Sequence, residues 1–214
     1  MDERSELRAT MGAGGSGRRL LIEALRNRMT ELAPQRVKVL QLGCDDASMI
    51  VEAAGDVEIE TYCGIDPFRP RLTAIRRVLK PRADDLELIC GDVAGALDGV
   101  TGSFDLILAG RSLHDLSAEQ RRRVLRRCRQ LIAADGVTIV YDLTHGPDER
   151  DPDDRVWPAD DTITGYVSES LFEACWWESV ARDSGYGRFD RLCRNATEPV
   201  AVYALAVQGP NPRM

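Results

Sequence analysis

The sequence has few of the residues and segments that define several classes of protein. It contains only two histidines and no cysteine pair with CxxC spacing, which argues against a zinc site. No apolar run approaches the ~20 residues of a transmembrane helix, and the first ten residues show no signal-peptide core. The net charge of −7 argues against nucleic acid or an anionic membrane as a partner. We therefore expect a cytoplasmic protein that binds neither nucleic acid nor membranes.

The six cysteines do not indicate disulfides. Most of them fall within apolar strand or helix patterns, where buried and reduced thiols are expected. A chain of 214 residues buries roughly 70% of its unfolded surface, so it needs neither disulfides nor a metal to fold. We expect 1–35 to form an N-terminal tail and helix, and 36–214 to form one domain.

Short apolar segments alternate with helical patterns along most of the chain. Strands are predicted at 37–42, 57–65, 86–90, 104–109, 137–141, 187–194 and 200–207, and helices at 16–32, 47–54, 70–79, 117–133 and 168–184. The alternation predicts a parallel sheet that is covered by helices on both faces. Ligands of such sheets bind at the carboxyl ends of the strands. The acidic stretch 145–162 is interpreted as a long surface loop.

The first strand, turn and helix have the layout of a nucleotide-binding unit. Strand 37–42 is followed by Gly43 and a helix, and the second strand ends in Asp66. The start of that helix offers free backbone N–H groups, and a carboxylate can accept hydrogen bonds from both hydroxyls of a ribose. The turn is poor in glycine, because Asp45 and Ala47 stand where such turns usually carry glycines.

A series of motifs extends this pattern over most of the chain. They are VLQLGC, CGID, ICGDV and FDLILAGRSLHDL, then LSAEQRRRVLRRCRQLIAADGVTIVYD, and finally SGYGRFDRL with VAVYALAV. In this order, from about Val37 to Val207, they resemble class I S-adenosylmethionine-dependent methyltransferases. The resemblance implies a Rossmann-like three-layer α/β/α sandwich with a seven-stranded, mostly parallel sheet in the order 3-2-1-4-5-7-6, the last strand being antiparallel. It makes 36–214 a methyltransferase-like domain with S-adenosylmethionine as its cofactor.

The resemblance also implies roles for single residues. Gly43 lets the backbone approach the methionine moiety, Asp66 binds the ribose hydroxyls, and Asp92 accepts from the adenine amino group. The residues expected at the cofactor are Gln41, Gly43, Asp45, Asp66, Pro67, Phe68, Asp92, Val93, Ala109 and Arg111. For Asp66 and Asp92 the alternative is capping of a surface loop.

The sequence departs from the family at three positions around Gly43. Gln41 replaces an acid, and Asp45 and Ala47 replace glycines. Side chains at these places narrow the space for the methionine carboxylate, and Asp45 repels it by ~1 kcal/mol when water screens the pair. Cofactor binding is the weakest part of the functional hypothesis for this reason.

Candidate catalytic groups follow the fourth and fifth strands. His114 and His145 are natural bases for a hydroxyl proton because imidazole titrates near neutrality. Asp142 lies three residues before His145. The alternatives are a structural hydrogen bond for His114 and an ordinary loop position for His145. Metal dependence is not expected, because the further Asp-Asn pair of catechol-type relatives is not found.

The basic run 121–129 shares its helix with a stripe of apolar residues at helical spacing. The arginines are expected on the solvated outer face, the alternative being an RNA or acidic partner.

Two hypotheses follow for the function. The first is an S-adenosylmethionine-dependent methyltransferase for a small molecule, acting on a hydroxyl in specialised metabolism, with homodimer formation left open. The second is a methyltransferase fold that has lost methyl transfer and serves as a cyclase, an isomerase or a non-catalytic partner subunit.

Overall fold

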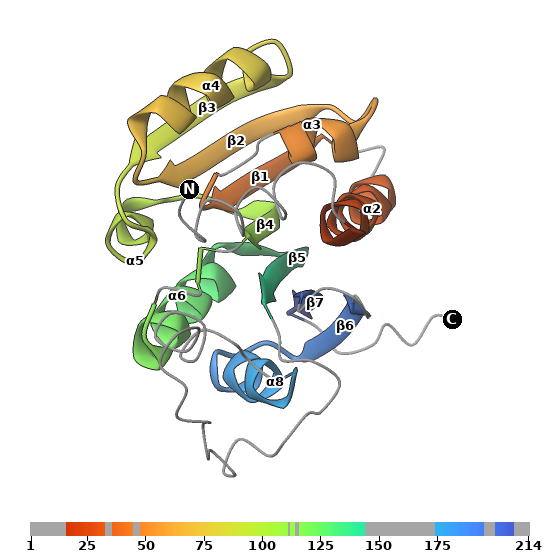
Figure 1. Cartoon of the computed structure of the whole chain (residues 1–214), viewed down its shortest axis with the longest axis vertical. Coiled ribbons are helices and arrows are strands. Elements are labelled where there is room, and N and C mark those ends of the chain that lie inside the picture. The colour runs from red at the N-terminus through yellow and green to blue at the C-terminus, as the bar shows by residue number, and fades with distance from the viewer. Residues whose placement is uncertain are drawn as a thin grey trace, which may run out of the picture.

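The computed structural model describes residues 16–32, 36–44, 48–110, 112–113, 116–143, 174–194 and 200–207. Within these residues the chain forms a seven-stranded sheet in the order β3-β2-β1-β4-β5-β7-β6 (Figure 1). The pairs among β1 to β5 are parallel, whereas β7 runs antiparallel to both β5 and β6. The predicted fold class and strand order are confirmed.

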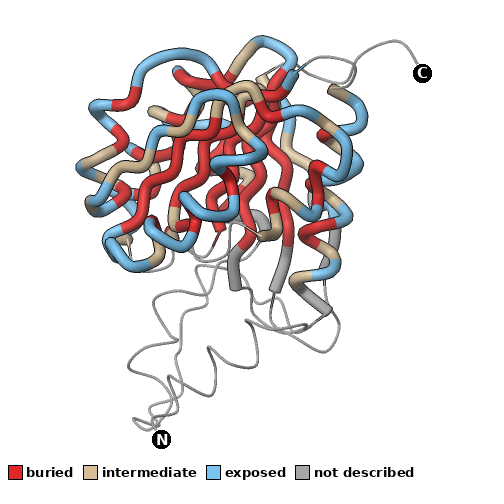
Figure 2. The backbone as a smooth tube through the Cα atoms, turned by 90° about the horizontal axis from the view of Figure 1, so that it is seen from above, coloured by how far each residue is buried: buried red, intermediate tan, exposed pale blue. Residues whose placement is uncertain are grey.

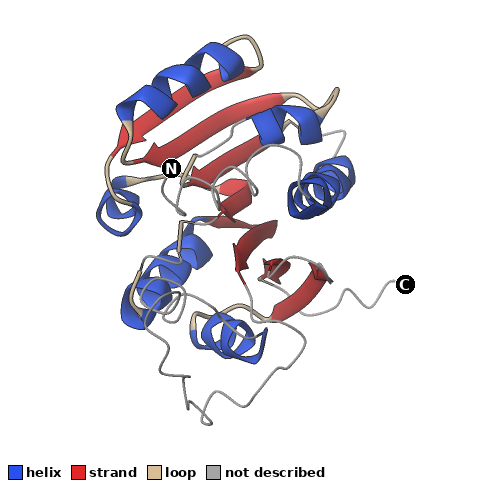
Figure 3. Ribbon diagram, viewed as in Figure 1, coloured by secondary structure: helices blue, strands red, loops and turns tan. Residues whose placement is uncertain are grey.

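The elements alternate along the chain as the sequence pattern indicates (Figure 3). The strands are β1 Val37–Leu42, β2 Ile59–Asp66, β3 Ala83–Cys90, β4 Phe104–Gly110, β5 Ile132–Leu143, β6 Arg188–Arg194 and β7 Val200–Ala206. The helices are α2 Ser16–Leu32, α3 Ser48–Ala54, α4 Arg69–Leu79, α5 Val93–Ala96, the 3-10 turn η1 Leu97–Gly99, α6 Ala118–Leu131 and α8 Ala174–Asp183. No described helix has the length and apolar character that crossing a membrane requires.

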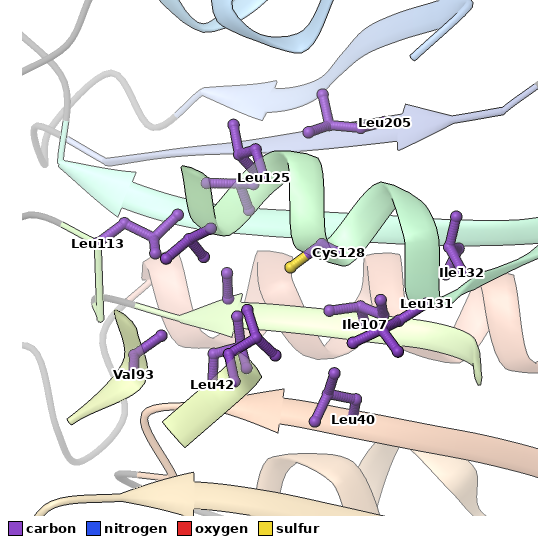
Figure 4. Packing of buried hydrophobic residues seen from close by; sticks show 14 of the residues in the cluster. Leu40, Leu42, Val93, Ile107, Leu113, Leu125, Cys128, Leu131, Ile132 and Leu205 are labelled. Atoms are coloured by element: carbon purple, nitrogen blue, oxygen red, sulfur yellow. The ribbon is translucent and has the colours of Figure 1, made fainter. Parts of the chain in front are cut away.

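Two hydrophobic clusters lie on the two faces of the sheet. Helices α2, α3 and α4 pack on one face, where Val39 of β1 and Leu106 of β4 point. Helices α5, α6 and α8 pack on the other face, against Leu40 of β1 and Ile107 of β4 (Figure 4). Successive strand residues thus point to opposite layers, and the buried residues run through the middle of the domain (Figure 2).

Several element boundaries differ from the prediction. Helix α6 ends at Leu131, and Ile132 already has an extended backbone (φ −78°, ψ 136°), so Ala133 belongs to β5 and not to the helix. The buried β-branched side chain of Ile132 favours this early change to a strand. Strand β3 begins at Ala83, because an edge strand tolerates the exposed acids that follow. The short helices α5 and η1 were not predicted.

Several other predictions fall outside the described residues. They concern the tail 1–15, the acidic stretch 145–162 and the first part of the helix expected at 168–184.

The capping box at the start of α6 is present, since Ser117 and Gln120 exchange hydrogen bonds between side chain and backbone.

Four of the six arginines of α6 bind other parts of the same chain. Arg121 donates to the Leu113 carbonyl (2.6 Å), Arg123 pairs with Asp98, Arg127 donates to the Val100 carbonyl (2.7 Å), and Arg129 donates to the Gly185 carbonyl (2.8 Å). The prediction of a solvated face is wrong for Arg121, whose exposure is only 2%. A buried guanidinium is held here because a carbonyl of the segment after β4 accepts from it.

Candidate functional site

The carboxyl ends of β1, β2, β3 and β4 meet at one edge of the sheet. Leu42 pairs with Ile65 on one side and with Ala109 on the other, and Asp66 pairs with Cys90. Hydrogen bonds also join the turns beyond the strands, since the Gly43 N–H donates to the Ile65 carbonyl at 2.8 Å. The candidate residues of β1 to β4 are therefore neighbours in space.

Gly43 takes a conformation that glycine alone adopts freely. Its φ is +73°, and a Cβ at this position would stand 2.5 Å from the Cβ of Ser112. The turn after β1 thus packs directly against the segment after β4. The Ser112 hydroxyl oxygen is buried and has no hydrogen-bond partner in the described structure.

Asp66 is completely buried at the end of β2 and joins two turns. Its Oδ2 accepts from the Cys44 N–H at 3.0 Å, and its Oδ1 accepts from the Phe68 N–H at 2.7 Å. The Arg71 guanidinium lies 3.6 Å from Oδ2 and balances the buried charge. A carboxylate has about four acceptor positions, so each oxygen keeps one for a ligand.

Gln41 and Cys44 belong to a buried polar cluster under the turn. The Tyr62 hydroxyl donates to Gln41 Oε1 at 2.7 Å and lies 3.7 Å from the Cys44 sulfur. A Cβ on Gly64 would stand 2.8 Å from both Cys44 Sγ and Tyr62 Cε1, so the glycine makes room for this cluster. The side-chain oxygen of Gln41 is thus engaged in supporting the turn.

Phe68 presents an exposed aromatic ring beside Asp66. Its exposure is 52%, and the Arg71 guanidinium lies over the ring at 4.7 Å from the centroid. One guanidinium therefore contacts both the ring and the carboxylate. Pro67, between them, is exposed as well. An exposed ring at this edge offers a planar apolar surface to a ligand.

Asp92 is the N-cap of α5, where its Oδ1 accepts from the Gly95 N–H at 2.9 Å. Asp92 therefore performs the capping role that was considered as the alternative to adenine binding. The second oxygen of its carboxylate has no hydrogen bond to the described residues. Val93 and Ala109 are buried in the core below the edge.

The remaining predicted site residues are not described in full. Asp45, Arg111, His114 and His145 lie outside the described residues. Asp142 lies near the end of β5, opposite Ala201 of β7, but its side chain is not described. The roles expected for these five residues stay predictions. Among the described residues, no group of three or more His, Cys, Asp or Glu is placed to hold a metal.

Comparison with known proteins agrees with this geometry. Residues 40–138, from β1 into β5, match the family model of a methyltransferase domain. The chain has the fold of class I methyltransferases, and this segment of it matches a methyltransferase domain. No match was found among curated protein sequences.

Three solved structures illustrate the likeness. The carbon methyltransferase of CurJ has a TM-score of 0.68 and 14% identity, over 97% of this chain and 59% of its own. Mitomycin 7-O-methyltransferase MmcR has a TM-score of 0.57 and 19% identity, over 86% of this chain and 54% of its own. A TehB-like S-adenosylmethionine-dependent methyltransferase from Corynebacterium glutamicum has a TM-score of 0.56 and 16% identity, over 95% of this chain and 94% of its own. This chain spans little more than half of the first two, and at these identities the likeness concerns the fold.

S-adenosylmethionine is the cofactor that the methyltransferase domain implies, and the described residues fit it. Asp66 has acceptor positions left, and Phe68 offers a ring for the adenine. The hydroxyl of Ser112 is a buried polar group without a partner in the described chain. Asp66 and Ser112 both contact the turn after β1, and Phe68 lies two residues beyond Asp66.

Sequence reasoning missed three residues of this region. Arg71 and Tyr62 lie within predicted elements, where nothing in the pattern marks them as partners of Asp66 and Gln41. Ser112 was not among the residues expected at the cofactor. Gln41 stands where the family has an acid. This neutral side chain could have indicated that the position faces a neutral buried partner, which the structure shows to be Tyr62.

The thiols of the described residues are expected to differ sharply in reactivity. Burial raises the pKa of Cys44, Cys63 and Cys128 from 9.0 to about 12, whereas Cys90 is exposed. At pH 8 only about 10⁻⁴ of each buried thiol is ionised, so iodoacetamide should label Cys90 well before these three. Peptide mass spectrometry of timed samples measures the order.

The same thiols give a dependence of stability on pH. Their folded pKa lies above the unfolded value, so the unfolded chain loses these protons first as the pH rises. Stability should therefore fall between pH 9 and pH 12. Fast labelling of Cys44 in the folded protein at pH 8 would contradict the burial on which both expectations depend.

Proposed function

We propose that this chain transfers the methyl group of S-adenosylmethionine to a hydroxyl of a small molecule, in specialised metabolism. The observation that carries the proposal is the arrangement of Gly43, Asp66 and Phe68 at the carboxyl edge of a methyltransferase domain. Oxygen is the proposed acceptor because His114 and His145 can take a hydroxyl proton, and among structures of the same fold the mitomycin enzyme is an O-methyltransferase whereas CurJ is a carbon methyltransferase.

The reaction needs a base beside the acceptor. When bound, S-adenosylmethionine supplies a methyl group on a positively charged sulfur. The substrate hydroxyl gives its proton to the base as its oxygen forms a bond to the methyl carbon. Gly43, Asp66 and Phe68 would hold the cofactor, whose sulfur would keep the electron pair of the broken carbon–sulfur bond. His114, His145 and Asp142 are the proposed bases, since each follows β4 or lies at the end of β5.

The arginines of α6 support a small substrate over a nucleic acid. Arg121, Arg123, Arg127 and Arg129 each bind a carbonyl or a carboxylate within the chain. Such arginines are engaged in holding the fold together, and the net charge is negative. The homodimer and the cytoplasmic location stay predictions.

Calorimetric titration with S-adenosylmethionine and S-adenosylhomocysteine is the first test. We expect a dissociation constant in the micromolar range, which corresponds to about −8 kcal/mol at 1 μM. His145→Asn and His114→Gln should then lower methyl transfer by about 10²-fold or more at the position that supplies the base, with cofactor affinity unchanged. Absence of binding at millimolar cofactor would overturn the proposal.

The second candidate is a methyltransferase fold without methyl transfer. The observation in its favour is that both oxygens of Asp66 already accept backbone N–H groups while the side chain is fully buried. The departures at Asp45 and Ala47 agree with it. Tight cofactor binding without any transfer to a panel of hydroxylated small molecules supports this candidate, whereas transfer to one of them excludes it.

A further inference from the structure

The Ser112 hydroxyl stands out among the polar groups at the carboxyl edge of the sheet. It lies just beyond the end of β4, and its oxygen is buried without a hydrogen-bond partner in the described structure. The side chain packs against the turn after β1, since a Cβ on Gly43 would stand 2.5 Å from Ser112 Cβ and 3.3 Å from Ser112 Oγ. The hydroxyl therefore lies beside the turn that approaches the methionine moiety in the resemblance.

A buried hydroxyl without a partner lowers the stability of a folded protein, because it has lost its bonds to water. Such groups are uncommon, and one that lies beside a candidate ligand site is a candidate partner for the ligand. At Ser112 the neighbouring backbone is already engaged, since the Gly43 N–H donates to the Ile65 carbonyl and the Cys44 N–H donates to Asp66. A molecule that binds between the β1 and β4 ends can supply what Ser112 lacks.

We infer that Ser112 binds the amino-acid moiety of S-adenosylmethionine through its hydroxyl. This inference rests on the proposed function. The hydroxyl donates to the carboxylate of that moiety and takes over part of the binding that glycines at the positions of Asp45 and Ala47 serve in the family. A hydrogen bond to a charged group is among the stronger contacts that one side chain makes.

The test compares two ligands that differ only beyond the adenosine sulfur. S-adenosylhomocysteine carries the amino-acid moiety, and 5′-methylthioadenosine does not. We expect Ser112→Ala to weaken binding of the first by about 10-fold or more and to leave binding of the second unchanged. Calorimetry measures both affinities on the same protein preparation. Ser112→Gly, which removes the hydroxyl with different packing, should give the same difference between the ligands.

A thermal melt without ligand supplies an independent readout. Removing a buried hydroxyl without a partner should raise the melting temperature by about 2–4 °C, so Ser112→Ala is expected to be more stable yet weaker in binding.

Ser184 offers a matched control, because its buried hydroxyl also has no partner in the described structure. It precedes β6 at the opposite edge of the sheet. Ser184→Ala should therefore raise the melting temperature without changing either affinity.

The outcomes separate the inference from the proposed function. Equal affinity of Ser112→Ala and the unaltered chain for S-adenosylhomocysteine overturns the inference alone. The same is true if both ligands weaken equally, since the contact is then not with the amino-acid moiety. If the unaltered chain binds neither ligand, the proposed function fails and takes this inference with it.

Discussion

Gly43→Ala is expected to lower the free energy of unfolding by about 2–5 kcal/mol and to abolish cofactor binding. Two effects add at this position. The φ of +73° is strained for any residue with a Cβ, and the new methyl group would stand 2.5 Å from Ser112 Cβ. The segment after β4 must move away, and this displaces the groups that surround the turn. Urea denaturation and calorimetry with S-adenosylhomocysteine measure the two losses.

Gly55 gives a matched control for the backbone effect. It also has a positive φ, +54°, but a Cβ there would meet no atom within 4 Å. Gly55→Ala should therefore cost only the strain, about 1–2 kcal/mol, and keep full cofactor affinity. The double variant Gly43→Ala/Ser112→Gly should recover the part of the stability loss that comes from crowding between the new methyl group and Ser112. Equal losses for Gly43→Ala and Gly55→Ala would show that the approach to Ser112 is unimportant.

Asp66→Ala is expected to weaken binding of S-adenosylhomocysteine by at least about 100-fold and to lower stability by about 2–5 kcal/mol. The substitution leaves the buried Cys44 N–H and the partly buried Phe68 N–H without their acceptor, and it removes the proposed acceptor for the ribose hydroxyls. Asp66→Asn should reduce both binding and stability less than Asp66→Ala does, because an amide offers one acceptor oxygen where the carboxylate offers two.

Asp105 separates the structural part of this effect from the binding part. Its Oδ2 accepts from the Lys38 N–H at 2.9 Å, at the start of β1 and β4 and therefore at the opposite edge of the sheet. Asp105→Ala should lower stability by about 1–2 kcal/mol and leave cofactor affinity unchanged. If Asp66→Ala behaved in the same way, Asp66 would be a structural group only.

The strand order followed from the sequence because each apolar segment is short, bounded and separated by a helical pattern. The start of α2 at Ser16 and both ends of β1 agree with the prediction to the residue. Such patterns report which residues face the core, and local signals such as Gly43 and Ser117 report where an element begins or ends. They carry no information on which turns come together at the sheet edge.

The contacts at the site depend on which turns come together at the sheet edge, and the sequence did not predict them. Ser112 lies far from Gly43 along the chain, and only the pairing of β1 with β4 brings them together. The partners of Asp66 come from two different turns for the same reason. Arg121 is a different case, because it lies three residues before Val124 on the apolar stripe of α6. Its position in the stripe agrees with its burial, but its charge led to the prediction of the outer face, which is wrong for this residue.

The place of β7 in the sheet has a consequence for how the domain forms during synthesis. β7 is the last described strand along the chain, yet it lies between β5 and β6 and is the only described strand that pairs with β6. A nascent chain that ends before Val200 can assemble β1 to β5, but the exposed edge of β5 then has no neighbour and β6 has no partner. The ribosome must therefore release residues 200–206 before the sheet is complete, which makes late, long-range pairing the slow part of folding.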